Sequence, residues 1–237
     1  MAKRISIHEE EHRDVSGGVQ RAAMFGISDG LVTNVSLILG FAGANPDPTL
    51  VRLAGIAGLV AGAFSMASGE YLSMQAQSEL FERELEIERI ALRESPDLER
   101  QELIGIYRSK GLDATLAEEL ADTMMRNPEL ALETHAREEL GIDPTAVGSP
   151  WQASGISLLT FAFGALLPLL PWFFLSGGAA IVWSIGIGII AALAVGALLG
   201  RFTGRSKVFS ALRQLGVAVL AASVTYGVGR LVGASTH

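Results

Sequence analysis

The sequence predicts an all-α, polytopic membrane protein with five transmembrane helices and an acidic helical module between the second and the third. Residues 79–143 hold 18 of the 25 acidic side chains, whereas the 57 residues from 144 to 200 contain no Asp, Glu, Lys or Arg. Charged residues make up only 18% of the chain, below the roughly 25% of ordinary soluble domains. Such a separation of charged from apolar residues is typical of a chain that crosses a bilayer.

Five apolar stretches are long enough to cross the hydrocarbon layer, which takes roughly 20 mostly apolar residues in a helix. They cover about residues 20–44, 50–74, 152–174, 179–199 and 208–232. Four segments follow from them. These are a polar tail (1–18), the first two spans (19–77), the acidic module (78–148) and the last three spans (149–237).

The distribution of basic residues predicts the orientation, because Lys and Arg are enriched in cytosolic loops. With the N-terminus inside, 16 of the 18 basic residues are cytosolic, and only Arg52 and Arg230 are outside. Without the acidic module the ratio is still 8 to 2. We therefore expect the N-terminus and the module to be cytosolic. The lack of a long targeting extension favours a prokaryotic inner (plasma) membrane.

Several classes of function are disfavoured by the composition and motifs. The chain has no cysteine, so it forms no disulfide or thiolate metal site. No basic patch with interleaved aromatic residues suggests a nucleic-acid partner. His8 to His12 fits the H-E-x-x-H zinc motif but lies in a polar tail without an apolar helix face. Residues 186–191 imitate a dinucleotide loop within a span, so no organic cofactor is expected.

Two acids inside the spans suggest a path for a cation. Asp29 lies about two turns into the first span, and Glu70 lies near the end of the second, four residues after Met66. A carboxylate inside the membrane needs a cation, a proton or a polar partner. Alternatively, Asp29 caps a span that begins at Gly30 and has only 15 residues, and Met66 is a packing residue.

Glycines recur at spacings of three or four along the spans, as Gly26 and Gly30 do in the first. This spacing favours close packing of helices, either within one chain or at the seam of a homodimer.

Carboxylates in the acidic module lie beside apolar helix faces. Glu84 and Glu88 share a face with Leu85 and Leu92, and Glu99 and Glu102 lie next to Leu103. Carboxylates so placed need protons, bases or a metal to neutralise them. A further helix beginning near Asp113 carries Met124 and Met125, and Glu129 follows. Carboxylates with thioethers suit a divalent transition metal, although an ordinary acidic bundle has the same pattern.

Two motifs carry a family resemblance that covers about residues 14–233. They are residues 21–32 (RAAMFGISDGLV) and residues 65–71 (SMASGEY). With two spans, an acidic module and three further spans, the chain resembles the vacuolar iron transporter family, whose members move ferrous iron or manganese out of the cytosol.

The resemblance implies a homodimer with a pathway at the subunit interface, where metal is exchanged for protons. Asp29, Met66 and Glu70 match the pathway positions. The matching ligand positions of the module are Glu88, Glu99, Glu102, Met124, Met125 and Glu129. Ala91 stands where the family has a further ligand, and Glu84 is its expected substitute.

The expected function is export of Fe²⁺, with Mn²⁺ as the other candidate, driven by protons moving inward and not by an enzymatic reaction. The alternatives are a manganese exporter, and a membrane-anchored metal sensor or di-iron protein. A di-iron bundle needs two Glu-x-x-His motifs. The acidic module has none, since Glu133 precedes His135 by only two residues.

Overall fold

The computed structural model describes residues 18–44, 47–141, 143 and 148–234, and every regular element in them is a helix. The helices are α1 (Gly18–Ala44), α2 (Pro48–Glu94), α3 (Pro96–Ser109), α4 (Ala114–Met125), α5 (Pro128–Glu138), α6 (Pro150–Leu169), α7 (Pro171–Phe174), α8 (Gly177–Phe202) and α9 (Lys207–Ala234). The predicted all-α class is therefore confirmed. His8 and His12 lie outside the described residues.

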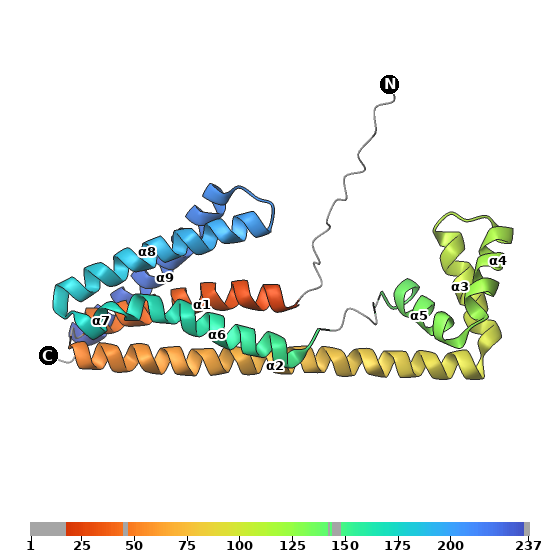
Figure 1. Ribbon diagram of the computed structural model, residues 1–237, viewed down its shortest axis with the longest axis horizontal. Coiled ribbons are helices and arrows are strands. Elements are labelled where there is room, and N and C mark those ends of the chain that lie inside the picture. Colours follow the sequence, from red (N-terminus) through yellow and green to blue (C-terminus); the bar gives the residue numbers. More distant parts are fainter. Residues whose placement is uncertain (1–17, 45–46, 142, 144–147, 235–237) are drawn as a thin grey trace, which may run out of the picture.

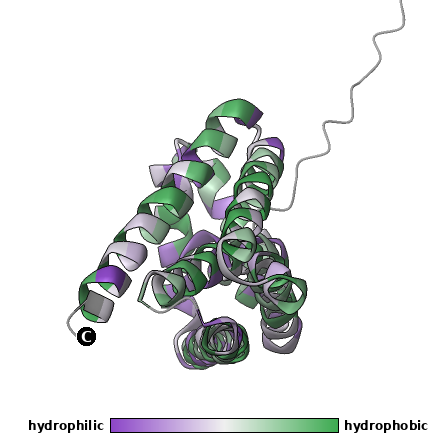
Figure 2. Ribbon diagram, turned by 90° about the vertical axis from the view of Figure 1, so that its left-hand side faces the viewer, coloured by the Kyte–Doolittle hydropathy of each residue, from purple (hydrophilic) through white to green (hydrophobic). Residues whose placement is uncertain are grey.

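In the described part of the chain, five helices are long and apolar enough to cross a membrane, as the sequence predicted: α1, α2, α6, α8 and α9. Much of their length is coloured hydrophobic in Figure 2, and Phe174, Val182 and Leu231 are among the exposed large side chains. Such a surface suits lipid rather than water. The third apolar stretch differs from the expectation in one detail. It is divided between α6 and the short α7 before Pro171, which has no N–H to donate to a continuing helix.

The second span and the first helix of the acidic module form one continuous helix of 47 residues, α2. The segment boundary drawn after residue 77 falls inside it. Between Tyr71 and Glu94 the sequence has neither Gly nor Pro, so nothing interrupts the helix where it leaves the apolar region. Figure 1 shows α2 along the whole molecule, with the other apolar helices beside its first half and α3, α4 and α5 at its far end.

Close approaches of backbones hold the membrane bundle together. α1 packs chiefly against α6 and α9, and α6 also packs against α2. At two crossings a glycine is required, since a Cβ at Gly30 would overlap the carbonyl of Phe161, and a Cβ at Gly229 would overlap that of Gly40. These glycines therefore serve packing within one protomer.

The acidic module has a small core of its own. Leu103 and Tyr107 from α3 pack against Ala117 and Ala121 from α4. The side chain of Asp113 caps α4 by accepting a hydrogen bond from the Leu116 amide at 3.0 Å. Asn127 caps α5 in the same way, and these two caps fix where α4 and α5 begin.

Candidate metal-binding sites

Four metal-ligating side chains from three segments of the module converge at the far end of α2. They are Glu88 from α2, Glu99 from α3, and His135 and Glu139 at the end of α5. One ligand atom of each lies within 4.8 Å of all the others. His135 Nδ1 lies 3.2 Å from Glu88 Oε1, 3.4 Å from Glu139 Oε2 and 3.8 Å from Glu99 Oε2. We call these residues the four-residue cluster.

Helix breaks bring the cluster together. α2 ends before Ser95, and Pro96 starts α3 in a new direction, so that Glu99 returns towards Glu88. Asn127 and Pro128 start α5. Near the end of this helix, His135 and Glu139 are four residues apart and so lie one turn apart on the same face.

The cluster is shielded from water. The side chain of His135 is fully buried, those of Glu88 and Glu99 are 8% and 13% exposed, and that of Glu139 is 29% exposed. The pKa of Glu88 is raised to about 7, chiefly by burial. His135 lowers this pKa, whereas the neighbouring carboxylates raise it, namely those of Glu139, Glu99 and Glu102. Burial likewise raises the pKa of Glu99.

Two buried polar atoms in the cluster lack a hydrogen-bond partner among the described residues, namely Glu88 Oε1 and His135 Nε2. Three neighbouring carboxylates repel one another unless protons or a cation neutralise them. Carboxylate oxygens and an imidazole nitrogen together suit divalent transition metals such as Fe²⁺, Mn²⁺ or Zn²⁺. The cluster therefore has ligand atoms for a divalent cation, and such a cation would relieve the repulsion between its carboxylates.

The ligands predicted for the module are distributed over several places. Glu88 and Glu99 belong to the cluster. Glu102 is exposed and near enough to raise the pKa values of both. Glu84 is half-buried one turn before Glu88 on α2.

The predicted methionines lie elsewhere in the module. Met124 packs against the core of α3 and α4. Met125 and Glu129 line a cavity of about 480 Å³ together with Arg89 and Arg93, and no member of the four-residue cluster lines this cavity.

His135 and Glu139 were missed by the sequence analysis. The available signal was their spacing of four residues, which puts a histidine and a glutamate on one face of a helix. The Glu-x-x-His pattern does not include His135, which instead forms a His-x-x-x-Glu pair with Glu139.

The acids of the membrane bundle have different partners. Glu70 forms an ion pair with Arg21, whose Nη2 lies 2.8 Å from Glu70 Oε1. Asp29 accepts a hydrogen bond of 3.4 Å from Thr33, one turn along α1. Since α1 begins at Gly18, Asp29 lies inside the helix and not at its N-cap. Met66 packs against the cluster of Ala63, Phe161 and Ala165.

Comparison with known proteins identifies the family. The model of the VIT family matches residues 20–230. Vacuolar iron transporter 1 of Oryza sativa subsp. japonica is 33% identical over 226 residues, covering 95% of this chain and 90% of the relative. Vacuolar iron transporter 1 of Tulipa gesneriana is 31% identical over 226 residues, with 95% and 91% covered. The vacuolar iron transporter of Acanthamoeba castellanii is 33% identical over 233 residues, with 95% and 84% covered.

These matches extend over nearly the whole chain and include all five apolar helices. The family consists of transporters and not of enzymes. The chain is thus a multi-pass integral membrane protein and belongs to the VIT family, the vacuolar iron transporters that its two motifs resemble.

Proposed function

We propose that this protein exports ferrous iron from the cytosol in exchange for protons, and that the acidic module captures the ion first. The observation that carries the proposal is the four-residue cluster, in which three carboxylates and a buried histidine converge and His135 Nε2 makes no hydrogen bond to the described residues. The names of the relatives, all vacuolar iron transporters, support iron as the cargo.

Capture begins with the negative charge of the module. Residues 79–143 carry 18 acidic and 8 basic side chains, so they attract cations from the surrounding solution. Glu102 and Glu84 lie on the approach to the cluster as further carboxylates. Binding of a divalent ion displaces the protons that the crowded carboxylates otherwise retain.

Passage through the membrane uses Asp29, Met66 and Glu70. Each carboxylate holds either a proton or part of the charge of a divalent ion, and this alternation gives the exchange a physical basis. A homodimer would supply two copies of each residue. In the apolar, membrane-spanning stretch of α9, only 6% of the residues are buried within the protomer. A cavity of about 370 Å³ with apolar walls lies between α1 and α9. Both observations favour a second subunit there.

Manganese is the second candidate cargo, because the three carboxylates of the cluster suit Mn²⁺ as well as Fe²⁺. The imidazole of His135 shifts the preference of the cluster towards iron, since nitrogen donors increase the relative affinity for later metals of the series. Iron is therefore the primary proposal.

The test is transport by the purified protein in sealed proteoliposomes with an imposed pH gradient, followed by a metal-sensitive and a pH-sensitive dye. Fe²⁺ movement should be coupled to proton movement in the opposite direction. Asp29→Asn removes a charge and a titratable proton and should abolish both signals. His135→Ala should raise the half-saturating Fe²⁺ concentration by about tenfold, as loss of a metal ligand does, with little change in maximal rate.

Glu133→Gln is the matched control for the module. Glu133 lies on α5 and pairs with Arg137, outside the cluster, so its replacement should leave transport unchanged. Wild-type rates in Asp29→Asn would refute the pathway. Fe²⁺ movement without proton movement would refute the exchange.

A further inference from the structure

We infer that Arg21 is a resident cation at Glu70, which an entering divalent metal ion displaces, and that this makes Arg21 a selectivity residue at the cytosolic entrance. The inference rests on the proposed function, since it takes Glu70 as part of the metal path.

The ion pair joins the first turn of α1 to α2. Arg21 Nη2 lies 2.8 Å from Glu70 Oε1, and the two side chains are 69% and 14% exposed. Among the described residues, this is the one ion pair between two of the membrane-length helices. The carboxylate is therefore shielded while its cation reaches into open space, so the guanidinium can leave without any helix moving.

The surroundings of Glu70 suit a transition metal. Met66, Glu70 and Met74 follow each other at intervals of four residues and share one face of α2. Met74 lies against the start of α1, where a Cβ at Gly18 would be 3.4 Å from its sulfur. A carboxylate flanked by two thioethers offers a hard and a soft donor at once, the mixture that favours Fe²⁺ over Ca²⁺ or Mg²⁺.

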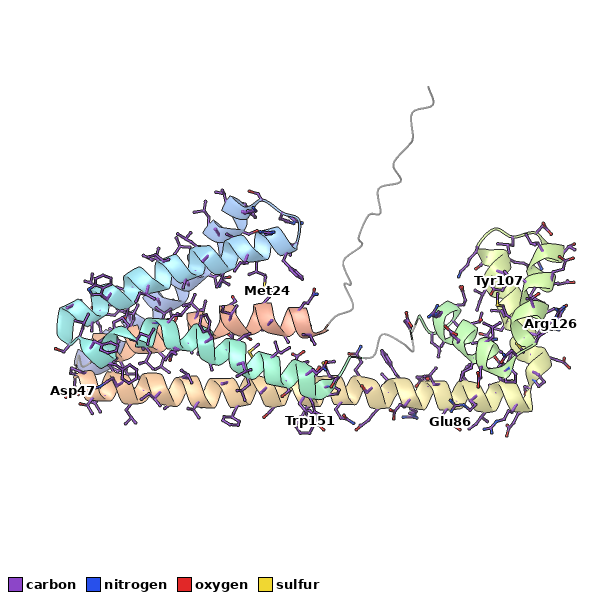
Figure 3. All side chains as sticks on the ribbon, in the orientation of Figure 1. Met24, Asp47, Glu86, Tyr107, Arg126 and Trp151 are labelled. Carbon is purple, nitrogen blue, oxygen red and sulfur yellow. The ribbon has the colours of Figure 1, made fainter. Side chains whose placement is uncertain are left out.

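Aromatic rings mark the depth of this site. The ring centroids of Tyr71 and Trp151 lie 4.6 Å apart. Tyr71 follows Glu70 in the sequence, and Trp151 lies at the start of α6. Figure 3 shows Trp151 where α6 begins against α2. Aromatic residues of this kind gather at the membrane–water interface, so Arg21 and Glu70 lie at the mouth of the bundle.

Charge decides which ions displace Arg21. A partly exposed ion pair is weak, so a divalent ion, with twice the charge of the guanidinium, gains enough at Glu70 to replace it. Na⁺ or K⁺ would only exchange one single charge for another. Once the metal has moved on, the guanidinium returns and neutralises Glu70, which keeps monovalent cations from occupying it.

The experiment compares Arg21→Gln, Arg21→Lys and the control Arg52→Gln in proteoliposomes, with Fe²⁺ uptake measured with and without excess KCl. Arg52 lies near the start of α2, and its side-chain hydrogen bonds to the described residues go to Pro48 and Thr49 of its own helix. Arg21→Gln should lower the KM for Fe²⁺ several-fold and make transport sensitive to K⁺. Arg21→Lys should restore both properties, and Arg52→Gln should match the wild type.

A purely structural role of Arg21 predicts a different result: a lower maximal rate or melting temperature, an unchanged KM and no sensitivity to K⁺. That outcome would overturn the inference.

Binding separates this inference from the proposed function. In a His135→Ala background, which weakens the cluster, Arg21→Gln should strengthen the remaining Mn²⁺ binding, and adding Glu70→Gln should cancel that gain. If wild-type protein fails to transport Fe²⁺ but Arg21→Gln strengthens this binding, the role of Arg21 stands and the transport proposal falls. Equal binding in Arg21→Gln and its parent would refute the role of Arg21.

Discussion

At the scale of single residues, Glu88 has the most unusual environment in the module. Its carboxylate is 8% exposed and lies 3.2 Å from the ring of His135. Burial, and then the neighbouring acids Glu139, Glu99 and Glu102, disfavour its charged form. Its protonation state in the metal-free protein therefore depends on pH in the neutral range.

This environment predicts how stability varies with pH when a chelator keeps metal away. The pKa of Glu88 rises from 4.5 to about 7 on folding, so the folded state retains the proton more strongly than the unfolded state. The associated stability is complete below pH 4.5 and is lost as pH rises through about 7. Glu88→Gln should flatten this part of the profile of melting temperature against pH. The exposed Glu86→Gln is the control, and a wild-type slope in Glu88→Gln would contradict the assignment.

The sequence indicated part of the cluster because periodicity shows which residues share a helix face. It placed Glu88 and Glu99 beside apolar stripes, and both lie in the cluster. Periodicity does not show which helix covers a face. The stripe of Met124 is covered by α3, where Leu103 and Tyr107 pack against it, whereas the face of Glu88 meets His135 from the last turn of α5.

At the scale of elements, the membrane helices depend on glycines at their crossings. α1 meets α6 at Gly30 and Gly164, where a Cβ would overlap backbone atoms of the other helix. Five spans and their approximate ends followed from hydropathy alone. The identity of the helix facing each glycine did not, because a glycine spacing specifies a close contact without its partner.

Replacing one such glycine should separate two helices. Gly30→Ala places a methyl group against the carbonyl of Phe161, so α1 and α6 must move apart and the melting temperature in detergent should fall. Gly186→Ala in α8 is the control, since nothing lies within 4 Å of its Cβ position. Alanine has a higher helix propensity than glycine, by up to about 1 kcal/mol, so Gly186→Ala should leave the stability equal or increase it. Equal melting temperatures for wild type and Gly30→Ala would contradict the packing.

At the scale of the whole molecule, the basic residues predict its orientation in the membrane. The described chain has no cysteine, so single cysteines can be labelled without background. Ser109→Cys at the end of α3 should react only from the cytosolic side, and Ser176→Cys before α8 only from the opposite side. Labelling of both from one side would refute the proposed arrangement.

The membrane in which the protein resides is less well indicated by its sequence than the fold is. The expectation of a prokaryotic inner membrane finds no support in the relatives, whose names place them in the vacuole. Charge distribution acts on the orientation of helices across any bilayer, and it therefore carries no information about which bilayer that is.

The continuity of α2 has a mechanical consequence. Glu88 lies 17 residues beyond Tyr71 on the same helix, which corresponds to about 25 Å at 1.5 Å per residue. With no Gly or Pro in between, this length acts as a lever arm pivoting at the membrane surface. A tilt of about 10° in the membrane part would swing the ion-collecting end through about 4 Å. On the proposed function, a rearrangement of the bundle would thereby be amplified into a larger displacement of the captured ion.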